Sequence, residues 1–350
     1  MLTFFGTEKK LLSFLSRKRN LQSSVWHLPA GRQGQWKYVL FQLPIELVVS
    51  KIAYLYLINK KLFRFLFILT CIALVSCTKD PPVFNLENLN NNEIGCFGHA
   101  GMGSESIYPV NTLESFQSCL DRGADGTEMD VQVTKDSVLV IYHDENLNSL
   151  SSCSGYIRDL NWSDISNCKM NSTLFNNLEV LSFDEFMDKV PYPHNYVFTL
   201  DCKSHVDEAG KEAYYKLFGR ALARAIEKYG MINNIFIEHP EVSFLNYIKS
   251  INPDAKLFLL NNDFDYSLKT ARENGYFGLS MQNESVTAEQ IKMAHDSSTH
   301  VTLWGVTTDK ENYAAVEKCP DFMQTDNIEY LLKIFGKYNR NKGYVYSITK

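Results

Sequence analysis

The stretch GADGTEMDVQVTKDSVLVIYHD, residues 123–144, contains two apolar runs of strand character, Gly126–Val133 and Val138–His143. Only residues 134–137 separate them. Parallel neighbours need a crossover connection of a dozen or more residues, so the two runs cannot be adjacent parallel strands. They predict an antiparallel hairpin, and this constraint decides how the other strands are counted.

Short apolar runs alternate with amphipathic stretches through the rest of the chain. Further strand candidates are Ile94–Gly98, Tyr196–Asp201, Ile235–Glu238, Lys256–Leu260, Phe277–Met281, Val301–Val306 and Phe322–Thr325. Helical patterns occur at Leu113–Arg122, Phe183–Lys189, Ala213–Tyr229, Val242–Ile251, Tyr266–Asn274, Ala288–Asp296, Glu311–Lys318 and Tyr330–Tyr338. Such alternation over about 250 residues predicts a parallel sheet, above all a closed (β/α)8 TIM barrel.

The hairpin brings the strand count down to the eight that a barrel requires. We take Gly126–Asp130 as the second barrel strand and residues 131–143 as a hairpin excursion from its C-terminal end. A turn centred between residues 135 and 136 would pair residues whose numbers add up to 271, which places His143 opposite Glu128. Residues 145–182 then form an insertion before the third barrel strand, and the barrel spans residues 94–340.

The C-terminal ends of the predicted barrel strands carry polar residues, and barrel enzymes place their reactive groups there. These residues are His99, Glu128, Asp130, Asp201, Lys203, Glu238, His239, Trp304 and Asp326. Glu128 and Asp130 lie two apart on one strand and so share a face. With Asp201 from the next strand they would make an oxygen-rich site suited to one Mg²⁺ or Ca²⁺. The plainer alternative is that they are solvated charges at strand ends.

The segment before the predicted barrel has the features of an export signal. Basic residues at 60, 61 and 64 precede the mostly apolar run Phe65–Val75, and Leu74–Cys77 resembles a bacterial lipobox. We therefore expect residues 1–76 to be a leader and Cys77 to carry lipid on an exported lipoprotein that faces the periplasm or lies on the outer-membrane surface. The alternative, a short transmembrane anchor, has about half of the ~20 apolar residues that a span needs.

Two neighbouring segments follow from this interpretation. The stretch 77–93, rich in Asn and Pro, is predicted to be a flexible tether. Residues 1–57 do not fit a signal peptide, which normally begins a protein, so we expect that Met1 is a misassigned start. A membrane-associated extension is the alternative for that region.

Charge and cysteine content limit the partners and the covalent links. From residue 77 onward the chain has 24 basic and 38 acidic residues, a net charge of −14, which argues against a nucleic-acid partner.

Export would permit disulfides, and Cys153 with Cys168 is the favoured pair. Buried free thiols are expected at Cys96, Cys119 and Cys202.

Four ordered motifs give the chain a family resemblance. They are Gly98-His99-Ala100-Gly101, Pro109-Val110-Asn111-Thr112, the stretch 123–136 quoted above and His143-Asp144. Together with Asp201-Cys202-Lys203, the strand around Trp304 and Gln324-Thr325-Asp326, the series resembles the glycerophosphodiester phosphodiesterase family over residues 95–332. Any one of the motifs is weak, whereas the ordered set is specific.

The resemblance implies a hydrolase that cleaves glycerophosphodiesters to glycerol 3-phosphate and an alcohol. His99 and His143 would then be the acid/base pair, which suits histidine because it titrates near neutrality. Glu128, Asp130 and Asp201 would hold one divalent cation. Lys203 would neutralise the phosphate, and Trp304 would contact the substrate.

Three positions depart from the family pattern. Ala100 stands where the family has an Arg, Val110 where it has a Glu, and Asp201 where it has a Glu. Ser104, a backbone amide of Gly101 or Gly103, or Lys203 could supply the missing phosphate contact. In having Asp rather than Glu at position 201, the chain resembles the sphingomyelinase D-like phospholipases, so a phospholipase D-like activity is one alternative. The other is a non-catalytic surface module that binds phosphodiesters.

Overall fold

The computed structural model describes residues 84–104, 106–175 and 177–339, so residues 1–83 with the predicted leader and Cys77 lie outside the described part. Eight parallel strands form a closed barrel, because β1 pairs with β2 on one side and with β10 on the other. In barrel order these are β1 (Gly95–Gly98), β2 (Gly126–Val133), β5 (Val197–Cys202), β6 (Ile235–His239), β7 (Lys256–Leu260), β8 (Gly278–Gln282), β9 (His300–Val306) and β10 (Phe322–Thr325). The predicted TIM barrel is confirmed.

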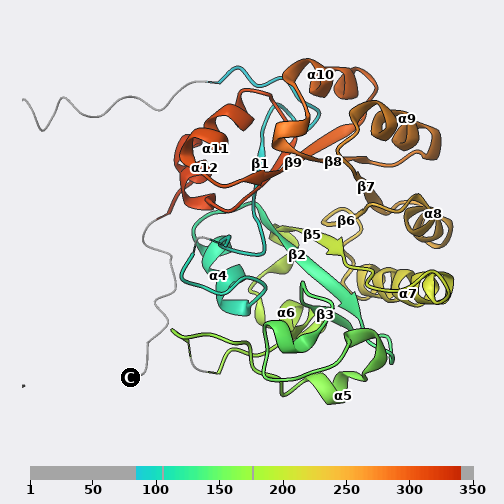
Figure 1. Cartoon of the computed structure of the whole chain (residues 1–350). Helices are drawn as coiled ribbons and strands as arrows, with labels where there is room; N and C mark the ends of the chain where they lie inside the picture. Colours follow the sequence, from blue (N-terminus) through green and yellow to red (C-terminus); the bar gives the residue numbers. More distant parts are fainter. Residues whose placement is uncertain (1–83, 105, 176, 340–350) are drawn as a thin grey trace, which may run out of the picture. The chain divides into compact units, whose positions relative to one another are not determined.

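Helices alternate with the barrel strands, as the amphipathic patterns predicted (Figure 1). They are α4 (Leu113–Asp121), α6 (Phe183–Lys189), α7 (Lys211–Tyr229), α8 (Val242–Ile251), α9 (Phe264–Asn274), α10 (Ala288–Asp296), α11 (Asp309–Val316) and α12 (Ile328–Ile334). Local sequence sets many of their starts: the Thr287 and Thr308 hydroxyls each accept a hydrogen bond from the amide three residues on. None of the helices in the described ranges is long and apolar enough to span a bilayer.

The hairpin exists, but its register differs by one residue from the predicted one. β2 runs unbroken to Val133, and its last three residues pair antiparallel with β3 (Leu139–Ile141), Val131 opposite Ile141. Paired numbers therefore add up to 272 rather than 271. The turn has three residues, because Val138 pairs with Thr134 and Ser137 adopts a left-handed φ of 70°. In this register the position opposite His143 is that of Met129, not that of Glu128.

The predicted insertion folds beside the hairpin around a small core of its own. It contains three short helices, η1 (Leu147–Ser149), η2 (Ile157–Asp159) and α5 (Trp162–Ile165), and the strand β4 (Leu181–Ser182), which extends the sheet beyond β3. Its buried apolar side chains include Tyr142 from the end of the hairpin. Cys153 and Cys168 are disulfide-bonded as predicted, and Cys96, Cys119 and Cys202 are buried free thiols.

The inside of the barrel is apolar at one end and polar at the other. Phe97, Phe236, Phe258 and Phe322 pack together in the lower part. Two residues further along their strands, towards the C-terminal ends, stand polar side chains such as Glu238 and Gln324. Side chains face the barrel interior at every second residue. The layer above the four phenylalanines therefore also faces inward, and its polar side chains lie at the mouth of the barrel.

The part of the predicted tether that the structure describes, residues 84–93, is not a free linker. Asn88 donates to the Pro320 carbonyl at 2.8 Å, and the Leu89 amide donates to Asp321 at 2.7 Å. Phe84 packs against the rings of Tyr313 and Phe335. These contacts lie next to the N-terminal end of β10, so the segment covers the end of the barrel opposite the polar mouth.

Candidate active site

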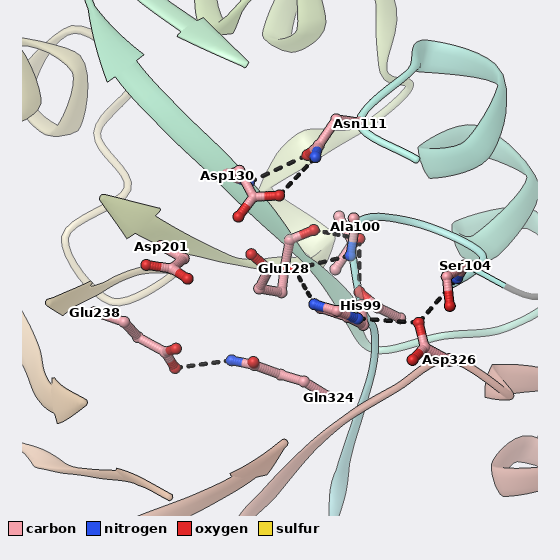
Figure 2. A network of polar contacts seen from close by, with 12 residues as sticks. His99, Ala100, Ser104, Asn111, Glu128, Asp130, Asp201, Glu238, Gln324 and Asp326 are labelled. Atoms are coloured by element: carbon pink, nitrogen blue, oxygen red, sulfur yellow. Dashed lines mark hydrogen bonds and ion pairs between the residues drawn. The ribbon is translucent and has the colours of Figure 1, made fainter. Parts of the chain in front are cut away.

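Three carboxylates from neighbouring strands converge at the polar mouth of the barrel. Glu128 and Asp130 point to one face of β2, and Asp201 lies opposite Asp130 on the parallel strand β5. One oxygen from each lies within 4.8 Å of the others, as the sequence predicted (Figure 2). The side chains of Glu128 and Asp130 are almost fully buried.

Glu128 is held at one oxygen and open at the other. Its Oε2 accepts a hydrogen bond from the Ala100 amide at 2.8 Å, whereas its buried Oε1 has no hydrogen-bond partner among the described residues. Burial and the nearby Asp130 raise its pKa well above the usual value. A buried carboxylate oxygen beside two other carboxylates, with no donor of its own, is a good ligand for a hard divalent cation. The three residues thus fit one Mg²⁺ or Ca²⁺.

Asn111 and Lys203 fix the other two carboxylates. The Asn111 side chain pairs with Asp130 twice, donating to the carboxylate at 2.6 Å and accepting from the Asp130 amide at 3.1 Å. The Lys203 ammonium bridges Asp201 at 2.6 Å and Asp130 at 3.0 Å. Burial works against this charge, but the two carboxylates raise the pKa of Lys203 above its usual value. Lys203 therefore stays cationic at the mouth.

His99 is oriented by a carboxylate from the last strand. Its Nδ1 lies 3.0 Å from Asp326, which follows β10, and its Nε2 lies 3.9 Å from Glu128. Burial lowers the pKa of His99, but the hydrogen bond with Asp326 and the charge of Glu128 outweigh this and raise it to about 9. Figure 2 shows His99 between Asp326 and Glu128, so Nε2 is the nitrogen that faces the triad.

His143 stands after the hairpin with its ring partly exposed. Its Nδ1 lies 2.7 Å from Asp144, and 54% of the side chain is accessible, which leaves Nε2 open to a ligand. Burial raises the pKa of the nearby Asp201, whereas Lys203 and, to a smaller extent, His143 act in the opposite direction. Both predicted acid/base histidines thus pair Nδ1 with a carboxylate.

Trp304, the predicted substrate contact, lies on β9 opposite Gln282. Its buried indole N–H has no hydrogen-bond partner within the described ranges.

Ala100, which stands where the family has an Arg, is buried and has a left-handed backbone with φ 48°. Its amide donates a hydrogen bond to Glu128. Of the suggested substitutes for the family Arg, the Ser104 amide already donates to Asp326 at 2.8 Å. Lys203 is the one cationic group among these suggested substitutes, and it lies beside Asp130 and Asp201.

A buried polar pair, Glu238 and Gln324, lies next to the triad, and the sequence analysis assigned neither residue a role. Glu238 of β6 lies beside Asp201 and accepts from Gln324 at 2.8 Å and from Ser280 at 3.0 Å. Burial and the negative charge of Asp201 raise the pKa of Glu238 to about 8. The sequence contained only a weak signal, a Glu and a Gln at inward positions near two strand ends.

His239, one of the polar residues at the predicted strand ends, makes contacts of a structural kind. It is fully buried and both ring nitrogens are bonded: Nδ1 accepts from the Glu241 amide at 2.9 Å, and Nε2 lies 2.8 Å from the Ser204 hydroxyl. Because Nδ1 accepts, the proton must be on Nε2. Burial lowers the pKa of His239 to about 3.

This histidine should make the protein less stable as pH falls. The unfolded chain binds a proton at His239 below about pH 6.5, whereas the folded chain resists protonation until about pH 3. Stability is then lost by up to ~1.4 kcal/mol per pH unit within that window. Urea unfolding at pH 7 and pH 5 should show a pH-dependent loss about 2 kcal/mol smaller in His239→Gln than in wild type. Equal losses would contradict the assignment, and His194→Gln, at an exposed position between α6 and β5, is the control.

Comparison with known proteins agrees with this geometry. Residues 101–330 match the model of the glycerophosphoryl diester phosphodiesterase family. A glycerophosphodiester phosphodiesterase from Bacillus altitudinis is 23% identical over 222 residues, which cover 61% of this chain and 87% of that protein.

Solved structures show the same fold at lower identity. A glycerophosphodiester phosphodiesterase from Parabacteroides distasonis aligns with TM-score 0.60 and 18% identity, covering 69% of this chain and 95% of its own. A phosphodiesterase from Oleispira antarctica, solved in complex with the product sn-glycerol-3-phosphate, aligns with TM-score 0.61 and 13% identity, covering 69% and 96%. With its barrel, its acidic triad and a family match over residues 101–330, this chain belongs to the glycerophosphoryl diester phosphodiesterase family.

Proposed function

We propose that this phosphoric diester hydrolase cleaves glycerophosphodiesters with one divalent cation held by Glu128, Asp130 and Asp201, and with His99 and His143 as the acid/base pair. The observation that carries the proposal is the convergence of the three carboxylates beside His99, whose Nδ1 is fixed by Asp326. When bound, a cation there would neutralise charge on the phosphate and polarise it.

The side chains of the mouth divide the remaining work. Lys203 places a permanent positive charge at the edge of the triad, where it can attract the phosphate. Each histidine pairs Nδ1 with a carboxylate and so has Nε2 for proton transfer. One accepts a proton from the attacking hydroxyl, and the other donates a proton to the leaving alkoxide.

Assays of residues 78–350 test the reaction and its substrate class together. We expect turnover of glycerophosphocholine with Mg²⁺ or Ca²⁺ and loss of turnover with a chelator. Turnover of lysophosphatidylcholine in preference to glycerophosphocholine would instead indicate the phospholipase D-like activity. No cleavage of these substrates or of bis(p-nitrophenyl) phosphate, together with unchanged behaviour in His99→Ala, would favour the binding module. Cation-independent cleavage would refute the carboxylate assignment.

We propose further that Cys77 carries the lipid of an exported lipoprotein. The support is the basic and apolar run 60–75 followed by the lipobox-like Leu74–Cys77. Expression of full-length wild type and Cys77→Ser in a bacterial host, with fractionation and a labelled fatty acid, tests this. Label and membrane recovery should be present in wild type and absent in the variant; a wild type without label would contradict the proposal.

A further inference from the structure

The backbone around His143 is held by side chains that have no place in the proposed chemistry. Gln132 is the next inward-facing residue of β2 after Asp130, and only 2% of it is exposed. Its Nε2 donates to the Tyr142 carbonyl at 2.9 Å and to the Asp144 carbonyl at 2.8 Å. One amide group therefore holds the residues on both sides of His143.

The carbonyl between them is held from another strand. His205, in the loop after β5, has its Nε2 3.0 Å from the His143 carbonyl oxygen. Since the carbonyl can only accept, Nε2 of His205 carries the proton. The backbone oxygens of three successive residues, 142 to 144, thus accept hydrogen bonds from Gln132 and His205.

The loop that carries His205 is itself fixed. Arg158 of the insertion donates to the His205 carbonyl at 2.6 Å and also bonds Glu145 at 3.0 Å. Its guanidinium lies over the Tyr156 ring, 4.3 Å from the centroid. On the other side, Ser204 is bonded to the buried His239. The insertion, the hairpin and β5 therefore meet at the residues around His143.

The His143 ring needs such support because little else holds it. Among the residues that the structure describes, the His143 ring has a hydrogen bond only with the adjacent Asp144, and more than half of the side chain is exposed. Proton transfer demands placement to a fraction of an ångström, and a misplacement of about 1 Å can cost about 100-fold in rate. Fixing the backbone is how a half-exposed ring can be kept in place.

We infer that Gln132 and His205 are positioning residues, which hold the carbonyls of residues 142–144 and thereby fix the His143 imidazole without touching the substrate. The inference rests on the proposed acid/base role of His143. It assigns a role in turnover to two residues that lie outside the predicted acid/base, metal and substrate groups.

The first test uses His205, since it is only partly buried and its replacement should fold. His205→Leu removes the donor and is expected to lower kcat for glycerophosphocholine about 10- to 100-fold with KM little changed. His205→Gln retains an N–H donor and should recover most of that loss. Gln132→Met should show the same kcat loss if it folds, which circular dichroism and thermal unfolding would establish.

The deciding measurement combines His205→Leu with His143→Ala. If His205 acts only through His143, the double variant should turn over bis(p-nitrophenyl) phosphate as slowly as His143→Ala alone. A further loss as large as that in the wild-type background would overturn the inference, as would an unchanged kcat in His205→Leu. Failure of the proposed function is distinguishable, because then wild type is inactive or His143→Ala is as active as wild type.

Discussion

Replacing His143 with alanine is expected to lower kcat about 10²- to 10⁴-fold, the usual size of an acid–base contribution. The fold should tolerate the change, because 54% of the side chain is exposed and, within the described part of the chain, its ring is hydrogen-bonded only to the neighbouring Asp144. The loss should therefore appear in turnover, not in the unfolding midpoint. Steady-state kinetics with glycerophosphocholine and a saturating cation measure it.

The matched control is His194→Ala, another exposed histidine, which lies between α6 and β5 outside the catalytic mouth. It should have wild-type kcat and KM. A loss below about threefold in His143→Ala, with normal activity in the control, would remove His143 from the acid/base pair.

The second large effect is expected for Glu128→Gln, which keeps the side-chain volume and an acceptor for the Ala100 amide but removes a buried charge. A cation at a phosphate is worth several kcal/mol, so loss of the ligand should cost about 10³-fold in kcat/KM, or ~4 kcal/mol. Wild type should also gain about 2.7 kcal/mol of stability at a cation concentration 100 times Kd. The variant should gain little, which thermal unfolding shows without any substrate.

Without added cation, the same variant should be more stable than wild type. Burial and Asp130 raise the pKa of Glu128, so its charge opposes folding at neutral pH until a cation balances it. Glu212→Gln is the control, since 84% of that side chain is exposed on α7. A cation-induced shift in Glu128→Gln equal to that of wild type would show that the cation binds elsewhere.

The barrel could be predicted because periodicity and connection length constrain it strongly. Four residues between two strand-like runs permit a hairpin and exclude a parallel pair, and that exclusion leaves eight barrel strands. The hairpin register could not be read in the same way, since two-residue and three-residue turns fit the same four residues. The left-handed φ of Ser137 decides between them, and Ser is no strong signal for that conformation.

Site residues were predictable where chemistry and strand position coincide. Glu128, Asp130 and Asp201 are acids at the ends of adjacent strands, and the structure brings their oxygens together. Asn111 lies 19 residues before Asp130 in a loop, and its double hydrogen bond to that residue depends on its own left-handed φ of 59°. No spacing rule reports such a contact, and the same holds for Gln132 and His205 around His143.

The packed segment 84–93 also determines at which end of the barrel the preceding chain joins it. It runs along the end of the barrel opposite the acidic triad, where Asn88 and Leu89 are bonded next to β10. Cys77 is seven residues upstream of Phe84. The lipid proposed for Cys77 would therefore be carried by the stretch of chain that joins the barrel at the end opposite the acidic triad.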